Sequence, residues 1–150
     1  PHHLLPDFPL VCADWCSNIQ LIRQPARGIR CSRAQRDAVV LDDIGFVQQS
    51  ALYRRFGGVV VDSADIRADP EGMLRKLCDR IDLPFSPAML SWPAGPKVED
   101  GVWARHWYEA VHRSTGFAGA EGPPPQLVGM AAELLREALP HYLALERDKL

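Results

Sequence analysis

A short apolar run that ends at an arginine and is followed by a proline constrains the fold more than any other segment. Residues 18–22 read Asn-Ile-Gln-Leu-Ile, and Arg23, Gln24 and Pro25 follow. The run predicts a strand, and Pro25, whose ring presets φ, predicts the first turn of a helix. In open α/β sheets, ligands bind in the crevice beyond the carboxyl ends of the strands. We therefore expect Arg23 in that crevice, where its guanidinium and the helix amides can hold a phosphate.

A second strand and a capped helix follow further along the chain. Residues 59–61 are three valines after a Gly57-Gly58 stop, and they are apolar on both faces, as a parallel strand between helical layers should be. Residues 69–71, Asp-Pro-Glu, supply a cap, a first-position proline and a first-turn acid, which predict a helix start. Strands that alternate with helices in this order predict a single α/β domain over residues 1–150 with parallel strands.

The remaining helical segments are predicted from apolar spacing and from the residues that begin or end helices. We expect helices at residues 25–36, from Asp42 or Asp43 to residue 56, at 102–112, at 126–139 and at 141–148, with a short helical turn at Ser86-Pro87. Pro140 should kink or split the last helix, because proline removes a backbone hydrogen bond from a helix interior. Residues 93–101 and 119–125 are rich in proline and glycine, which predicts loops.

Composition and charge exclude several classes of protein. The chain has 150 residues, of which 47% are hydrophobic, and its net charge is −2. A chain of this length and apolar content can bury one ordinary core. Its charge gives no long-range attraction to nucleic acid or to an anionic membrane, so we expect neither partner. Any phosphate site must therefore be formed by a few basic residues close together, because the net charge of the chain does not attract anions.

The cysteines do not form a recognised metal or redox motif. Cys12, Cys16, Cys31 and Cys78 are scattered apart from the first pair, whose spacing of four fits neither a zinc knuckle nor a thioredoxin-type site. A zinc site that adds a histidine from residues 2–3 to the first pair also lacks an evident fourth ligand. We therefore expect a reduced, cytoplasmic protein without a metal.

The segment from Leu21 to Arg27 carries a resemblance to a known family. Leu-Ile-Arg-Gln-Pro-Ala-Arg, with Ser32 further on, resembles the 3′-phosphate-binding strand and helix of sulfotransferases that use 3′-phosphoadenosine 5′-phosphosulfate. The order of later segments is similar to the carboxyl-terminal part of bacterial sulfotransferase-like proteins. Those segments are Asp43-Ile44-Gly45-Phe46, Gln48-Gln49, Val59–Asp62, Asp69-Pro70-Glu71, Leu83-Pro84-Phe85, Trp92–Lys97, Trp103 and Trp107-Tyr108.

The resemblance implies an α/β layered fold like that of P-loop nucleotide hydrolases, with a short parallel sheet. In the family, a strand and a loop that cradles the 5′-phosphosulfate open the domain, and nothing in this sequence has that character. No Gly-x-x-x-x-Gly-Lys-Ser/Thr string occurs either. We therefore expect the domain to be incomplete at its N-terminal end.

The resemblance also implies roles for individual residues. Arg23 would bind the 3′-phosphate. The family's serine falls eight places after that arginine, where this chain has Cys31, and Ser32 is the next residue. A step of one residue turns a helical side chain by about 100°, so Cys31 and Ser32 are both candidates for the phosphate contact. Lys97 could reach a phosphate or sulfonate oxygen, and His3, preferred over His2, would be the general base.

Each of these residues also has an ordinary structural interpretation. Arg23 could form a salt bridge at a strand end, and Arg27 and Arg30 could form a solvated helix face together with Ser32 and Cys31. Lys97 could be an exposed loop lysine, and residues 2–3 could be a frayed end or the remnant of a tag. The aromatic residues Trp92, Trp103, Trp107 and Tyr108 could line an acceptor pocket, stack on adenine or belong to the core.

The function implied by the resemblance is transfer of a sulfuryl group from 3′-phosphoadenosine 5′-phosphosulfate to a hydroxyl or amine of a small-molecule acceptor. The chain as given is expected to be inactive, because it lacks the loop that would hold the 5′-phosphosulfate. The alternative is a non-catalytic remnant of a nucleotide-binding fold whose exposed apolar surface favours self-association or a partner. A nucleotide kinase is disfavoured, because no magnesium-binding acid can be placed beside a phosphate loop.

Overall fold

A parallel pair of strands lies at the centre of the fold. The computed structural model describes residues 10–33, 39–102, 104 and 108–150. Strand β1 (Ile19–Ile22) pairs in parallel with β2 (Val59–Asp62), in a register that runs from Ile19 opposite Val59 to Ile22 opposite Asp62. Both predicted strands are confirmed, and the short parallel sheet with surrounding helices is the α/β fold that the sequence predicts.

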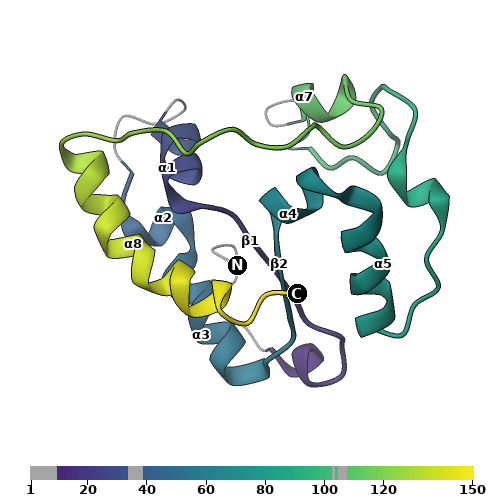
Figure 1. The fold of residues 1–150 in the computed structure, drawn as a ribbon, viewed down its shortest axis with the longest axis horizontal. Coiled ribbons are helices and arrows are strands. Elements are labelled where there is room, and N and C mark those ends of the chain that lie inside the picture. The colour runs from purple at the N-terminus through teal and green to yellow at the C-terminus, as the bar shows by residue number, and fades with distance from the viewer. Residues whose placement is uncertain (1–9, 34–38, 103, 105–107) are drawn as a thin grey trace.

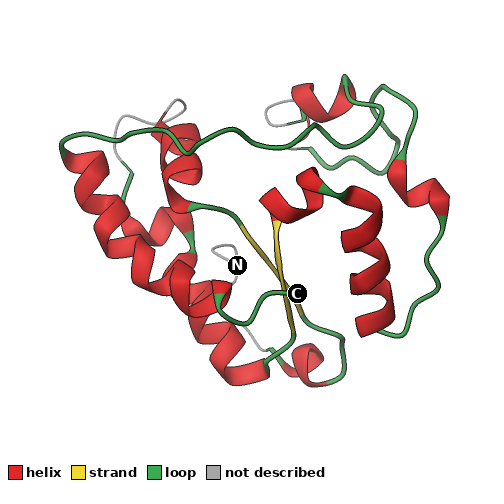
Figure 2. Ribbon diagram, in the orientation of Figure 1, coloured by secondary structure: helices red, strands yellow, loops and turns green. Residues whose placement is uncertain are grey.

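Helices flank the two strands (Figures 1 and 2). On one side lie α1 (Pro25–Arg33), α2 (Leu41–Ile44), α3 (Phe46–Phe56) and the long α8 (Met130–Glu146). On the other lie α4 (Ser63–Ala68) and α5 (Pro70–Arg80), and α7 (Glu109–His112) lies beyond α4. Two short 3₁₀ helices, η1 (Val11–Asp14) and η2 (Pro87–Leu90), complete the elements of the described part. None of the helices described is long and apolar enough to span a bilayer.

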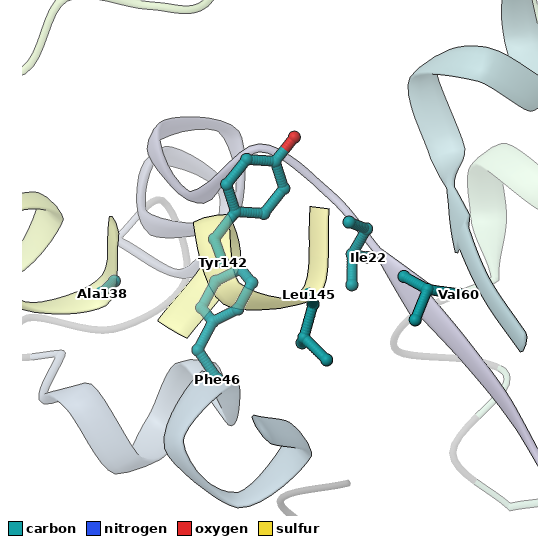
Figure 3. Close-up of a cluster of buried hydrophobic side chains, with 6 residues drawn as sticks. All are labelled: Ile22, Phe46, Val60, Ala138, Tyr142 and Leu145. Carbon is teal, nitrogen blue, oxygen red and sulfur yellow. The ribbon is translucent and has the colours of Figure 1, made fainter. Parts of the chain in front are cut away.

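The core joins the strands to α3 and α8. The buried cluster in Figure 3 comprises Ile22, Phe46, Val60, Ala138, Tyr142 and Leu145. The rings of Phe46 and Tyr142 meet edge to face, with centroids 6.2 Å apart, an arrangement favoured by the aromatic quadrupole. A second cluster packs α1 against α8 through Ile29, Ala131 and Leu134. These contacts fix the start of α1, and with it the position of Arg23, relative to the sheet.

Asp62 ties the carboxyl end of β2 to two helices. Its carboxylate is buried, caps α4 by accepting from the amide of Ala64 at 2.8 Å, and accepts from the hydroxyl of Tyr142 at 2.7 Å. Burial, followed by the hydrogen bond to Asp62, raises the pKa of Tyr142 above its ordinary value, so the phenol stays protonated. The turn from β2 into α4 is therefore anchored to α8.

Several helices differ from the sequence prediction, and α4 was not predicted. The helix expected to be capped by Asp42 or Asp43 has Val40 as its N-cap, two or three residues earlier, and the amide of Val40 donates to the carboxylate of Asp43 at 2.9 Å. It is divided into α2 and α3 at Gly45, whose φ of 70° is left-handed, a conformation that glycine adopts without steric cost.

The last helix begins at Met130, not near residue 126, and continues through Pro140. Pro140 is exposed, so the carbonyl that loses its intrahelical donor can bond to water, which explains why the helix is not split. Of the helix predicted at 102–112, residues 103 and 105–107 lie outside the described residues, and α7 covers the last turn.

Candidate functional site

Three arginines converge beyond the carboxyl ends of the two strands. Arg23 follows β1 directly, Arg27 lies in the first turn of α1, and Arg67 lies in the last turn of α4, the helix that follows β2. Each forms an ion pair with Glu121, at 2.6 Å for Arg23, 2.8 Å for Arg27 and 2.5 Å for Arg67. We call these three residues the arginine cluster. It occupies the crevice in which open α/β sheets bind ligands.

Glu121 reaches the arginine cluster from the connection between α7 and α8. Figure 1 shows this connection crossing above the carboxyl ends of the strands and past α1. The Glu121 side chain is 3% exposed, while that of Arg23 is 47% exposed. The cluster thus surrounds a buried carboxylate and keeps one face open to solvent.

The two carboxylate oxygens of Glu121 are bound unequally. Oε1 accepts from Nη2 of Arg23 at 2.6 Å and from Nη1 of Arg67 at 2.5 Å. Oε2 lies 2.8 Å from Nε of Arg27, but the geometry is not that of a hydrogen bond, and none reaches this buried oxygen from the described residues. One oxygen therefore carries two charged hydrogen bonds, and the other relies on charge alone.

Electrostatics keeps Glu121 ionised despite its burial. Burial alone would raise the pKa of Glu121, but the hydrogen bond from Arg23 and the charges of Arg23, Arg27 and Arg67 outweigh it and lower the pKa. Three guanidinium groups face one carboxylate, so the pairing leaves an excess of positive charge. Such a site is suited to an anion that carries more than one negative charge.

The arginines also hold the backbone on either side of Glu121. Nε of Arg67 donates to the carbonyl of Gly119 at 3.0 Å, and Nη2 of Arg27 donates to the carbonyl of Gly122. The connection between α7 and α8 is therefore fastened to the crevice by the same side chains that bind its carboxylate.

The structure places the predicted binding residues at three different positions. Arg23 lies in the arginine cluster. Ser32 is half-buried and Cys31 is exposed in the last turns of α1, and no hydrogen bond joins either to the cluster within the described part of the chain. Lys97 is exposed and lies in a separate pocket. His3, the predicted base, lies outside the described residues, as do Trp103 and Trp107.

The pocket that contains Lys97 has a volume of about 210 Å³ and lies beside α7. Its lining comprises Trp92, Pro93, Gly95, Lys97, Asp100, Tyr108, Val111 and His112. Nε2 of His112 lies 2.8 Å from Oδ2 of Asp100. The amide of Lys97, followed by the side chain of His112, lowers the pKa of Asp100, so this carboxylate is ionised and can orient the imidazole.

Sequence reasoning missed Arg67, Glu121 and the Asp100–His112 pair. Arg67 lies in α4, a short helix between the predicted strand at residues 59–61 and the predicted helix start at Asp69, and that helix was not predicted from the sequence. Glu121 had no usable signal, since a single acid in a connector rich in glycine and proline is ordinary. Within the described residues, no group of three or more histidine, cysteine or acidic side chains is placed to hold a metal ion.

Comparisons with known proteins place the chain in a family. Branched-chain-amino-acid aminotransferase-like proteins 2 and 1 of Arabidopsis thaliana are 45% and 46% identical to it over 83 residues. That segment is 55% of this chain and 15% of each relative, so the chain spans a small part of their length. No solved structure matches. The family model described as the sulfotransferase domain matches residues 1–148, and the chain therefore belongs to the sulfotransferase family.

Proposed function

We propose that the arginine cluster binds the 3′-phosphate of 3′-phosphoadenosine 5′-phosphosulfate. The observation that carries this proposal is that three arginines, from the end of β1 and from the helices that follow β1 and β2, converge on a single oxyanion, the carboxylate of Glu121. Guanidinium groups bind carboxylate and phosphate through the same paired hydrogen bonds. A phosphate dianion would also neutralise more of the cluster's charge than one carboxylate does.

The reaction that we propose for the whole protein is transfer of the donor's sulfuryl group to a small-molecule acceptor. The acceptor's hydroxyl or amine loses a proton and forms a bond to sulfur, and the bond between sulfur and the 5′-phosphate oxygen breaks, which leaves adenosine 3′,5′-bisphosphate. The arginine cluster would hold the end of the donor that does not react. Fixing that end contributes to positioning, and well-oriented reactants can gain about 7–11 kcal/mol in the barrier.

The other predicted site residues keep proposed roles in this reaction. Ser32 or Cys31 would add one hydrogen bond to the nucleotide, and Lys97 would contact a phosphate or sulfonate oxygen. His3 remains the proposed base from the resemblance. His112 is a second candidate, because Asp100 holds its Nε2 and orients Nδ1 as the proton acceptor. Its aromatic pocket lies beside α7, at the end of the molecule where the strands terminate, and would accommodate part of an acceptor.

The proposal is tested by titrating adenosine 3′,5′-bisphosphate into the wild type and arginine variants, with calorimetry as the assay. Arg23→Ala and Arg67→Ala should each lose roughly 2–4 kcal/mol of affinity, the range for breaking a charge-assisted contact. Arg23→Lys should also bind more weakly, because lysine lacks the planar fork. Arg113→Ala is the matched control, since Arg113 forms an exposed ion pair with Glu109 on α7. Affinities of the cluster variants within a factor of two of the wild type would refute the assignment.

A second candidate function, association, is favoured by the exposed apolar residues around β1. Trp15 is 90% exposed, and Ile19 and Leu21 on one face of the strand are 43% and 57% exposed. Apolar groups clustered beside a strand are typical of contact surfaces. Sedimentation of the wild type and of Leu21→Ser would test this candidate, which requires the wild type to self-associate and the variant to do so less.

A further inference from the structure

We infer that Glu121 is an internal competitor for the phosphate and that the centre of residues 116–129, a segment that we call the strap, must lift from the arginine cluster before the nucleotide binds. This inference rests on the proposed function, since it assigns regulation to the same site. The strap connects the end of the α7 region to α8 (Figure 1).

The Glu121 carboxylate and a phosphate would use the same hydrogen-bond donors. Arg23, Arg27 and Arg67 all direct nitrogen atoms at the Glu121 carboxylate, within 2.5 to 2.8 Å. Its side chain is 3% exposed, so it fills the position at which the three guanidinium groups meet. Two anions cannot occupy that position together, because their charges repel and their oxygen atoms would overlap.

The pairing between the Glu121 carboxylate and the arginine cluster is incomplete. Oε1 is shared by Arg23 and Arg67, and Oε2 accepts no hydrogen bond from the described residues although it is buried. A buried acceptor without a donor costs free energy. A phosphate monoester offers three terminal oxygen atoms and up to two negative charges to three guanidinium groups. It matches the donors better than the present occupant.

The strap is anchored at its two ends by packing contacts, and its centre is held by the arginine cluster. At one end Gly116 bridges to Ser91, and the ring of Phe117 packs edge to face against Trp92 at 5.4 Å. At the other end Leu127 packs on the cluster of Ile29.

Between these anchors, the hydrogen bonds and ion pairs described for residues 118–126 are those made with the arginine cluster. Gly119 and Gly122 flank Glu121, and neither has a neighbouring atom within 4 Å of the position a β-carbon would take. The centre of the strap can therefore move away without disturbing the packed clusters. Lifting it would cost the arginine contacts and little else.

This arrangement predicts how affinity depends on Glu121. When only a fraction of the molecules has the strap lifted, the apparent affinity for a phosphate ligand is reduced by that fraction. Glu121→Gln keeps the shape of the side chain and removes the charge that fastens the strap, so the lifted fraction should rise. We expect the variant to bind adenosine 3′,5′-bisphosphate about tenfold more tightly than the wild type does. Were Glu121 instead a support that orients the arginines for the nucleotide, the variant would bind more weakly.

The experiment compares calorimetric affinities of the wild type, Glu121→Gln and the control Glu133→Gln for adenosine 3′,5′-bisphosphate and for inorganic phosphate. Glu133 is exposed on α8 and pairs weakly with Arg136 at 3.7 Å, so its variant should match the wild type. Hydrogen exchange of the wild type gives a readout that needs no variant. The non-proline amides of residues 118–126 should exchange faster with ligand bound, while those of α8 should not change.

The outcomes separate this inference from the proposed function. If the bisphosphate binds the wild type and Glu121→Gln equally, or binds the variant more weakly, the inference is overturned and the phosphate site stands. Slower exchange in the strap with ligand bound overturns it in the same way. If the bisphosphate binds neither protein but inorganic phosphate binds Glu121→Gln more tightly than the wild type, the competitor role stands and the nucleotide assignment fails. If no phosphate ligand binds either protein, both are overturned.

Discussion

Tyr142→Phe should destabilise the fold through a single buried hydrogen bond. The hydroxyl of Tyr142 donates to Oδ2 of Asp62 at 2.7 Å and also lies 3.0 Å from Glu146. Figure 3 shows the ring within the core beside Phe46, with the oxygen at its outer end. Phenylalanine preserves the ring packing, so the variant removes the hydroxyl alone. The buried Asp62 carboxylate then loses a donor and keeps its bond to the amide of Ala64.

The magnitude follows from the burial of that carboxylate. Asp62 is 2% exposed, so water cannot easily replace the lost donor. A hydrogen bond to a charged group contributes about 1.5–3 kcal/mol, and we expect a loss of that size in the free energy of unfolding. For a chain of this length the melting temperature should fall by roughly 2–4 °C for each kcal/mol.

Urea unfolding followed by circular dichroism measures the change, with Tyr53→Phe as a matched control. The hydroxyl of Tyr53 donates to Asp148 at 3.0 Å in an exposed position, so water can replace it and the loss should stay below about 0.5 kcal/mol. Equal losses in the two variants, or no loss in Tyr142→Phe, would refute the reasoning from burial.

Two further predictions concern the strap and the proposed phosphate site. The pKa of Glu121 is lowered in the folded chain, so its ion pairs should stabilise the strap fully at any pH above 4.5, the ordinary pKa of glutamate. This contribution should be lost as the pH falls through the lowered pKa of Glu121. Hydrogen exchange of residues 118–126 between neutral and acid pH checks this, and a profile identical to that of Glu121→Gln would contradict it. Ser32→Ala should weaken the bisphosphate by about 1 kcal/mol if Ser32 donates to the phosphate. If Cys31→Ser strengthens binding while Ser32→Ala has no effect on the calorimetric affinity, the hydroxyl contact is absent from this chain.

Local signals in the sequence predicted much of the fold. The strand at Ile19–Ile22 and the helix that begins at Pro25 are confirmed, because an apolar run and a first-position proline act over a few residues. Asp69 caps α5 as predicted, with its carboxylate accepting from the amide of Gly72 at 3.0 Å. Two predictions of helix continuity failed. Gly45, in a left-handed conformation, divides one helix, and Pro140, which is exposed to solvent, leaves another continuous.

The site could be predicted only in part, because its members are far apart in sequence. Arg23 was expected beyond the strand end, and it lies there. Its partner Glu121 is 98 residues away, and Arg67 is 54 residues from the same carboxylate. No spacing rule links such positions, since their meeting depends on how the connection after α7 crosses the sheet. An arginine at the end of a strand could be predicted from the sequence, but the presence of Glu121 in the crevice could not.

The most direct test of the proposed phosphate site is a crystal structure of the chain with adenosine 3′,5′-bisphosphate. We expect the 3′-phosphate within hydrogen-bonding distance of Arg23, Arg27 and Arg67, with the carboxylate of Glu121 displaced from them. A nucleotide bound elsewhere, with Glu121 still paired to all three arginines, would refute both the phosphate site and the competitor role of Glu121.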